Sequence, residues 1–452
     1  MIFPVLNGES STFTTEGEYR ALAGLPSYGL IKGIQIDWKS IEVSNPDYLC
    51  LTVSRDVRED NTIFLWAGKE CLLEYPADYV SAGQRLRISL SESVLEKIET
   101  GESLRLTSSA RLWVVAENDR YPRLGIGFTD GNEVNDSLGR LKDSAITQFG
   151  WMHGCVLDGL YELYAQTGDK SYLEALKKQL RAYLTAEAVN YESPRNKIAI
   201  NEFESIELTL PIAVIAKLYP EHPSIDAALE YLESRTSESG LITDGWSTTA
   251  EGCYTIAYPL MLIGKQRNDG ALMRSALKQL QFRREALWVE ESLYLRRSPK
   301  GSHSFQHWAR GICWYFLGTV RTLIASGQEP TKEQMTHLQE LARYVAMWQD
   351  ESGLWRNFIT DAGQLFDTSG SSGIAAALAL AANRGWIDAA YLQNAKTCHV
   401  AMDDYFVDGG FLNSVAPNNK RGEKEQRANN RTCEPFALGL YGQLHAALLE
   451  SQ

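Results

Sequence analysis

Several motifs that carry common chemistries are missing from this chain of 452 residues. There is no HExxH helix, no glycine-rich phosphate loop and no nucleophile elbow. The seven cysteines are odd in number and form no Cys-x-x-Cys pair. They therefore predict buried free thiols in a reducing compartment, not a disulfide framework or a zinc site. His303 and His307 lie four residues apart but lack an evident third ligand, so we expect no metal and no cofactor.

Acidic residues outnumber basic ones, and long apolar runs are missing. The formal net charge is -13, and such a surface repels phosphate backbones, so we expect no nucleic-acid partner. No stretch approaches the roughly 18 apolar residues that span a bilayer, so we expect no membrane partner. The first residues, MIFPVLNGESSTFTTEGEYR, lack a basic segment followed by an apolar one. These features predict a cytoplasmic protein, unless the sequence begins after a removed signal.

Short segments with partial alternation of apolar and polar residues fill the first part of the chain, residues 1–130. Polar or glycine-containing turns separate these segments. They are IQIDWKSIEV, YLCLTVSRDV, TIFLWAG, RLRISLS, SLRLTSS and RLWVVAEN. About six strands of this kind predict a β-sandwich-like domain. Residues 131–145 are polar and rich in turn-forming residues, and they predict a linker.

Helical periodicity dominates residues 146–452. WMHGCVLDGLYELYAQTGDKSYLEALKKQLRAYL predicts a helix, a short loop and a second helix, and this layout recurs every 45–60 residues or so. Five such hairpins and one late helix fit either an open solenoid or a closed (α/α)6 toroid. The segment near 134–145 is a candidate for the twelfth helix. The fold class predicted is therefore a multidomain α+β chain, with a sandwich-like domain followed by a toroid.

The loops between consecutive hairpins are long and rich in tryptophan, glycine and charge. In a toroid these loops gather on one rim, where such loops usually carry function. They contain carboxylates beside aromatic residues, and hydrolysis of a glycoside needs a protonated carboxyl group and a second group that directs water or attacks. The candidates are Glu202, Glu204, Glu207, Asp244, Glu251 and Asp367.

These candidates have competing interpretations. Asp367 precedes Thr-Ser and is most simply a helix N-cap, and Glu202 is most simply solvated. Glu251 precedes Gly-Cys-Tyr and an apolar helix, so it lies at the mouth of a buried element and is the leading catalytic candidate. Glu204 and Glu207 compete for the second catalytic position, although either suits the first turn of a helix for electrostatic reasons alone.

Four stretches of the last two-thirds of the chain carry a family resemblance. They are TGDKSYLEAL, TDGWSTTAEGCYTIAYPLMLIG, HWARGICWYFLG and SGLWRNFITDAGQLFDTSGSSGIAAALA. In their order and spacing over roughly 300 residues they resemble glycoside hydrolase families 88 and 105, the unsaturated glucuronyl and rhamnogalacturonyl hydrolases. The resemblance does not cover the β-rich region.

The resemblance implies a mechanism in which an acid protonates carbon four of a 4,5-unsaturated uronate and water adds at carbon five. The acid, an Asp in those families, falls on Glu251, and the second acid falls near Glu204 or Glu207. The longer glutamate side chain departs from the family pattern, as does Ile312-Cys313 where Asn-Gly is usual. Direct hydrolysis of a saturated β-glucuronide, with Glu251 as general acid, is therefore a related hypothesis.

An oligosaccharide capped by uronic acid is the expected partner. Arg310 is the candidate for pairing with the substrate carboxylate, because guanidinium matches a carboxylate with two hydrogen bonds. An alternative ties Arg310 to a carboxylate of the helical core. The remaining substrate-binding candidates are Trp246, Asp244, Trp308, His303, His307 and Trp151, with Trp314 either a stacking residue or a core residue.

Two other classes of protein remain open from sequence. An epimerase or polysaccharide lyase of toroidal fold usually depends on His or Tyr as base, which would involve His153, His303 or His307. A carbohydrate-binding protein without catalysis would line no closed pocket with these loops. Assembly into a homo-oligomer is also left open.

Overall fold

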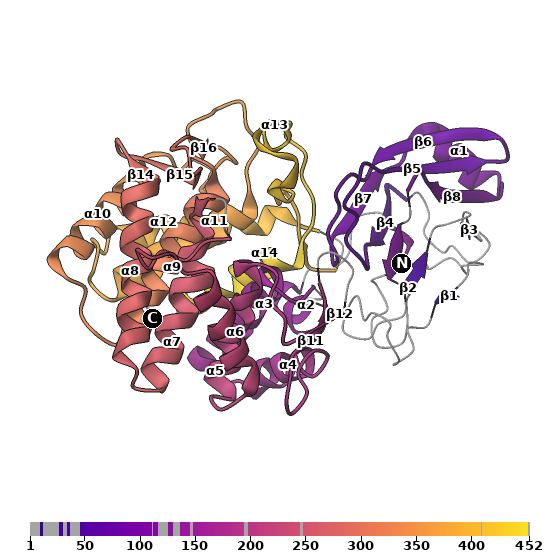
Figure 1. Ribbon diagram of the computed structural model, residues 1–452. Coiled ribbons are helices and arrows are strands. Elements are labelled where there is room, and N and C mark those ends of the chain that lie inside the picture. Colours follow the sequence, from indigo (N-terminus) through magenta and orange to yellow (C-terminus); the bar gives the residue numbers. More distant parts are fainter. Residues whose placement is uncertain are drawn as a thin grey trace.

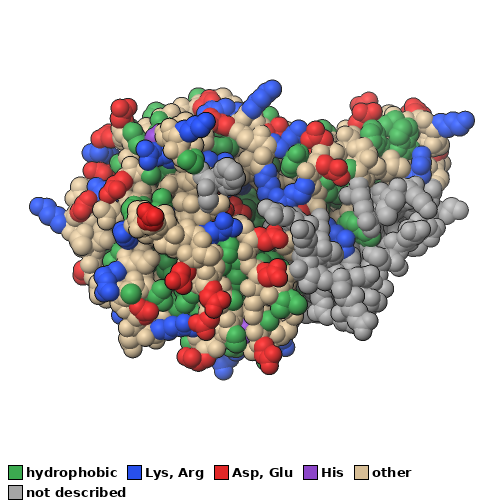
Figure 2. Space-filling view, in the orientation of Figure 1, with side chains coloured by type: hydrophobic (Ala, Val, Ile, Leu, Met, Phe, Trp, Pro, Cys, Tyr) green, Lys and Arg blue, Asp and Glu red, His purple; other side chains and the backbone are tan. Residues whose placement is uncertain are grey.

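A β-rich N-terminal part and a larger helical part lie next to each other in the computed structural model of the chain (Figure 1). Acidic and basic side chains are mixed over the face seen in Figure 2, and Lys and Arg are present where the two parts meet. The structure describes residues 46–110, 112–115, 125–129, 136–144, 148–193, 198–244, 247–407 and 409–450, together with the strands β1 (Ser10–Ser11), β2 (Ser27–Gly29) and β3 (Ile34–Ile36).

The strands of the β-rich part pair in antiparallel fashion. They are β4 (Tyr48–Thr52), β5 (Thr62–Ala67), β6 (Glu70–Pro76), β7 (Arg85–Ser89), β8 (Leu104–Ser108), β9 (Trp113–Val115) and β10 (Gly127–Thr129), with helix α1 (Glu92–Glu99) before β8. In the part of the chain that the structure describes, the strands form three sheets, in the orders β3-β8-β5-β6, β10-β4-β7 and β1-β2-β9. Strand β6 was not predicted, because its residues are exposed or half-buried and show no apolar alternation.

Side chains from two of these sheets share one apolar core. Leu49 and Leu51 of β4 belong to the same cluster as Ile63 and Leu65 of β5. Every second residue of β5 is buried, as the alternation in its sequence predicts. The sandwich-like domain over residues 1–130 stays a prediction, because much of that range lies outside the described residues.

Six helices of the described residues form an inner ring in the helical part. They are α3 (Trp151–Thr167), α5 (Leu210–Leu218), α7 (Tyr258–Gln266), α9 (Ala309–Ser326), α11 (Thr368–Asn383) and α14 (Pro435–Leu449). Each contacts the next in this order, and α14 contacts α3, so the ring is closed. This closure agrees with the predicted toroid and not with an open solenoid.

The partner helix of each pair lies before or after its inner helix in the sequence. The partners are α2 (Ser137–Ser144), α4 (Lys170–Leu180), α6 (Pro223–Ser234), α8 (Gly270–Leu287), α10 (Lys332–Met347) and α12 (Tyr391–Ala401). Helix α2 lies in the segment predicted as a linker and packs against α14 and α4. It therefore supplies the twelfth helix, as the sequence suggested for the segment near 134–145.

The ring closes through backbone contact at glycines. A Cβ atom on Gly159 of α3 would lie 2.4 Å from the carbonyl oxygen of Gly439 in α14, and one on Gly318 of α9 would lie 2.4 Å from the carbonyl carbon of Cys253. No side chain fits in either gap without displacing backbone. These glycines therefore allow neighbouring inner helices to approach closely.

An ionic network crosses the interior of the ring. Lys217 of α5 lies 3.0 Å from Glu162 and 3.5 Å from Asp158, both on α3, while Arg321 of α9 lies 3.1 Å from Glu162. The hydroxyl of Tyr254 donates to Asp158 at 2.7 Å. Removing one partner of such a buried set leaves an uncompensated charge, so the network favours one arrangement of α3, α5 and α9.

Short elements occupy the loops between the hairpins. They are β11 (Asn190–Glu192), β12 (Ile198–Ile200), β13 (Thr248–Thr249), β14 (Trp288–Val289), β15 (Ser292–Arg297), β16 (His303–Gln306), β17 (Phe406–Val407), β18 (Phe411–Leu412), the 3-10 helices η2 (Ile206–Thr209), η4 (Met402–Tyr405) and η5 (Asn419–Arg421), the π-helix η3 (Cys253–Ala257) and α13 (Glu423–Gln426). No helix in the described ranges is long and apolar enough to cross a bilayer. All seven cysteines are free thiols.

Candidate active site

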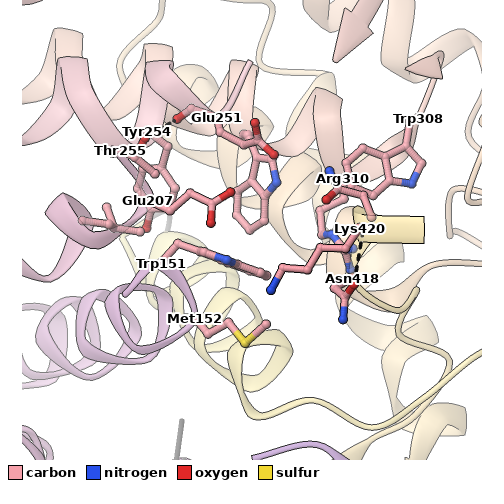
Figure 3. A pocket seen from close by; sticks show the side chains of 13 residues that line it. Trp151, Met152, Glu207, Glu251, Tyr254, Thr255, Trp308, Arg310, Asn418 and Lys420 are labelled. Carbon is pink, nitrogen blue, oxygen red and sulfur yellow. Dashed lines mark hydrogen bonds between the residues drawn. The ribbon is translucent and has the colours of Figure 1, made fainter. Parts of the chain in front are cut away.

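A cavity opens where the loops preceding inner helices converge (Figure 3). Its volume is about 520 Å³, including the open mouth. Carboxylates, tryptophans and cations share its wall. The lining residues are Trp151, Met152, Glu207, Leu210, Glu251, Tyr254, Thr255, Trp308, Arg310, Trp314, Asn418, Asn419 and Lys420.

Glu207 enters the cavity from η2, the turn that leads into α5. The backbone N–H of Ile206 donates to Oδ1 of Asp244 at 2.8 Å, and the Tyr231 hydroxyl lies 3.4 Å from the same oxygen. Asp244 therefore connects the loop before α7 to the turn that carries Glu207. Asp244 does not line the cavity. The sequence predicted that it binds substrate, whereas in this structure it contacts the backbone of Ile206.

Glu251 lies just before the π-helix η3, which continues into α7. Single π-turns of this kind are rare and occur often at functional sites. Buried Arg283 of α8 fixes the preceding loop, because its Nε donates to the Thr249 carbonyl at 3.0 Å and its Nη2 donates to the Ile242 carbonyl at 2.9 Å. The Glu251 side chain is thereby aimed into the cavity (Figure 3).

Burial shifts the pKa values of both carboxyl groups. Burial raises the pKa of Glu207 to about 7, and the charge of Glu251 contributes to this increase, while Lys420 and Arg58 oppose it. Burial also raises the pKa of Glu251, and the positive charge of Arg296 opposes that shift. Two interacting carboxyl groups with raised pKa values hold a proton near neutral pH, which is what general acid catalysis requires.

Arg310 lies in the first turn of α9, and its guanidinium stacks over Trp308 at 4.8 Å from the ring centroid. Its Nη1 donates to the carbonyl of Ala416 and its Nη2 to the carbonyl of Pro417. Arg310 thus holds the chain that brings Asn418 and Lys420 into the cavity. The alternative interpretation from sequence was that Arg310 pairs with a carboxylate of the helical core. The hydrogen bonds of its terminal nitrogens are instead to backbone carbonyls.

Three tryptophans contribute aromatic surface. Trp151, at the start of α3, is half-buried and packs edge-on against Trp314 with ring centroids 5.3 Å apart. Trp308 is 1% exposed, and its Nε1 donates to Oδ1 of Asn357 at 2.9 Å. Trp314 is also buried. Of the three, Trp151 therefore offers the most accessible face for stacking against a sugar ring.

Lys420 and Asn418 were not singled out by sequence. They lie in the loop before α14, which was recognised as long and charged, but no pattern distinguished these two residues within it. Their place depends on a contact with the β-rich part, since Nζ of Lys420 lies 3.6 Å from Oδ2 of Asp56. Such a contact between distant segments leaves no local sequence signal.

Other predicted site residues lie elsewhere. Glu204 does not line the cavity, so Glu207 is the member of that pair brought to Glu251. His303 Nε2 lies 2.9 Å from the Ala286 carbonyl oxygen, and His307 Nδ1 lies 2.6 Å from the Tyr344 hydroxyl, so both contact the protein away from the cavity. Trp246 lies outside the described residues.

Two further candidates from the sequence have structural contacts. Asp367 is the N-cap of α11, where its Oδ1 accepts from the Ser369 N–H at 3.1 Å, as the simpler interpretation predicted. His153 is buried, and burial lowers its pKa to about 3. A neutral imidazole without access to the cavity has no evident part in proton transfer to a substrate.

The closed ring of paired helices therefore carries a cavity in which two carboxyl groups with raised pKa values lie among tryptophans. The family model of Glycosyl Hydrolase Family 88 matches residues 132–441, more than half of the chain. The chain belongs to this family and is a glycoside hydrolase. No curated protein matches the chain.

Solved structures share the fold. A family 105 glycoside hydrolase from C. acetobutylicum has a TM-score of 0.59 at 16% identity, covering 70% of this chain and 98% of that one. A family 88 glycosyl hydrolase from Bacteroides vulgatus has a TM-score of 0.55 at 17% identity, covering 70% and 94%. The unsaturated glucuronyl hydrolase of Bacillus sp. GL1 has a TM-score of 0.51 at 15% identity, covering 68% and 88%.

Proposed function

We propose that this enzyme removes a terminal uronic acid from an oligosaccharide, with Glu251 as the acid and Glu207 as the second carboxylate. The observation that carries the proposal is the pair of carboxyl groups with raised pKa values in one cavity. A glycosidase needs one carboxyl group that stays protonated at working pH and a second group that is ionised when the first is not. Because the two groups interact, the proton retained near neutral pH belongs to the pair, and we assign it to Glu251 in the complex with substrate.

Two forms of the substrate fit this chemistry. With a saturated β-glucuronide, Glu251 donates its proton to the glycosidic oxygen as the bond to the anomeric carbon breaks. Ionised Glu207 then either removes a proton from the attacking water or attacks the anomeric carbon itself. With a 4,5-unsaturated uronate, Glu251 protonates carbon four and water adds at carbon five, and the resulting hemiketal opens and releases the next sugar.

The cavity wall supplies the remaining contacts in this proposal. Trp151 stacks against the apolar face of the uronate ring, and Trp308 completes the aromatic wall. Arg310 adds positive potential, although its two terminal nitrogens are engaged by backbone carbonyls. No histidine is among the lining residues in the described ranges, and the hydroxyl of the lining Tyr254 donates to Asp158 at 2.7 Å, while burial raises its pKa well above the usual value. Both observations favour a hydrolase over a lyase or epimerase with a histidine or tyrosine base.

One assay tests the proposal and separates the two substrate forms. The enzyme is incubated with 4-nitrophenyl β-glucuronide and, separately, with unsaturated oligosaccharides generated by a polysaccharide lyase. Release of nitrophenol identifies a saturated β-glucuronide as substrate, and loss of the enol-ether absorbance identifies the unsaturated form. Turnover of neither class, with turnover of a neutral glycoside instead, would exclude the uronyl specificity.

A further inference from the structure

The cavity contains the side chain of Lys420, whose position depends on contacts with both the β-rich part and the helical part. Lys420 extends across the cavity toward Trp151 (Figure 3), and Glu207 and Glu251 line the same cavity. Its ammonium lies 3.6 Å from Oδ2 of Asp56, which is longer than the roughly 2.7–2.9 Å of a strong ionic hydrogen bond. An ammonium has three donors, so Lys420 retains capacity for an anionic ligand.

Asp56 is a buried anchor for this cation. Its side chain is 5% exposed, and its Oδ1 accepts from the backbone N–H of Ala82 at 2.9 Å. Arg58 lies 2.7 Å from the same Oδ2 that faces Lys420. Two cations therefore share one carboxylate.

The β-rich part also holds the backbone around Lys420. Nδ2 of Asn418 donates to the Tyr79 carbonyl at 2.6 Å and to the Ser81 hydroxyl at 3.2 Å. Arg421 forms an ion pair with Asp78 at 2.9 Å. The position of Lys420 in the cavity is therefore set by residues nearly 340 positions away in the sequence.

The helical part holds the same backbone from its other side. Gln426 donates to the carbonyls of Pro417 and Asn418 at 2.9 Å each, in addition to the two bonds from Arg310. Hydrogen bonds from both parts of the molecule therefore fix the backbone that carries Lys420. A cation that is already fixed binds a ligand with little loss of conformational entropy.

An anionic sugar that enters this cavity meets two carboxyl groups. Repulsion disfavours its binding unless a cation faces the substrate's own carboxylate. Each terminal nitrogen of Arg310 donates one hydrogen bond, to the carbonyls of Ala416 and Pro417, and these two bonds fix the buried guanidinium against the backbone. The ammonium of Lys420 makes one ion pair among the described residues, the 3.6 Å contact with Asp56. Lys420 is thus the better placed of the two cavity cations.

We propose that Lys420 binds the carboxylate of the uronate and that Asp56 of the β-rich part acts as its positioning residue. The inference rests on the proposed function for the identity of the sugar. It extends that function by making the N-terminal part a component of substrate recognition, outside the region that the family model matches.

The test measures binding of D-glucuronate and D-glucose, which differ in the carboxylate, by titration calorimetry of the full-length protein. Lys420→Gln should raise the Kd for glucuronate at least tenfold, to the level of glucose, and leave glucose binding unchanged. Lys420→Arg should recover most of the affinity. Lys424→Gln is the matched control, because Lys424 lies four residues away and is exposed.

Asp56→Asn tests the positioning role. It keeps the acceptor for Ala82 but removes the charge, and it should raise the Kd for glucuronate severalfold without changing that for glucose. A general loss of folding would weaken both ligands equally and lower the Tm, and that result would exclude the positioning role.

The outcomes separate this inference from the proposed function. Unchanged glucuronate binding by Lys420→Gln, or no preference of the wild type for glucuronate over glucose, would overturn the role of Lys420. Preferential glucuronate binding that depends on Lys420, without hydrolysis of either uronide, would support the inference and contradict the proposed function.

Discussion

A Cβ atom on Gly252 would lie 2.0 Å from Nη2 of Arg283. The end of an arginine side chain usually moves aside at little cost, but Arg283 is fully buried and donates to the carbonyls of Thr249 and Ile242. The residue next to Glu251 is therefore glycine because the guanidinium that fixes the catalytic loop occupies the space of a side chain.

Gly252→Ala should consequently disturb Glu251 and the local packing together. We expect the free energy of unfolding to fall by about 1–3 kcal/mol, as is typical of overpacked cores, and kcat to fall at least tenfold. Denaturant unfolding and steady-state kinetics measure the two effects. Gly270→Ala, in the first turn of α8 and not at positive φ, is the control and should leave both nearly unchanged. Normal activity of Gly252→Ala would show that Arg283 does not fix the loop.

The raised pKa of Glu207 predicts a pH-dependent stability effect. Its pKa is about 7 in the folded state against an ordinary value of 4.5, so the folded protein holds this proton more tightly than the unfolded chain does. The contribution of Glu207 to the free energy of unfolding is therefore fully present below pH 4.5 and is lost as the pH rises toward and through 7. Glu207→Gln removes the ionisation and should raise the Tm more at pH 8 than at pH 5.

Thermal unfolding of Glu207→Gln and wild type at the two pH values measures this difference. Glu202→Gln is the control, because Glu202 is exposed, and it should shift the Tm equally at both values. A Tm increase for Glu207→Gln that does not grow with pH would mean that Glu207 is an ordinary solvated carboxylate.

Trp151 should contribute to substrate binding more than to the chemical step. Its accessible face suits stacking against a sugar ring, and aromatic contacts of this kind are worth about 0.5–1.5 kcal/mol. Trp151→Leu should therefore raise KM up to about tenfold, since tenfold corresponds to about 1.4 kcal/mol, with kcat retained within a few-fold. An equal loss in kcat with KM unchanged would assign Trp151 to the transition state instead.

Local sequence patterns predicted the helical hairpins because periodicity, N-caps such as Asp169 and terminal glycines such as Gly168 act within one or two turns. The resemblance to known hydrolases, together with residue chemistry, pointed to Glu251, Glu207 and Arg310, which the fold brings to one cavity.

Other features depend on contacts between distant segments. Lys420 reaches the cavity through Asp56, and the histidines predicted to bind substrate are instead engaged by Ala286 and Tyr344. The choice between Glu204 and Glu207 depended on the orientation of η2, which is set by Asp244 in another loop. Neither composition nor spacing encodes such pairings in a form that one sequence reveals.

The central claim is that Glu251 supplies the proton for cleavage of a uronyl bond. The most direct measurement is kcat of Glu251→Gln on whichever uronide the wild type hydrolyses, beside Glu202→Gln as an exposed control. The account predicts a loss of at least about 100-fold for Glu251→Gln, the lower end of general acid–base contributions, and near-normal turnover for Glu202→Gln. Near-normal turnover by Glu251→Gln would contradict it.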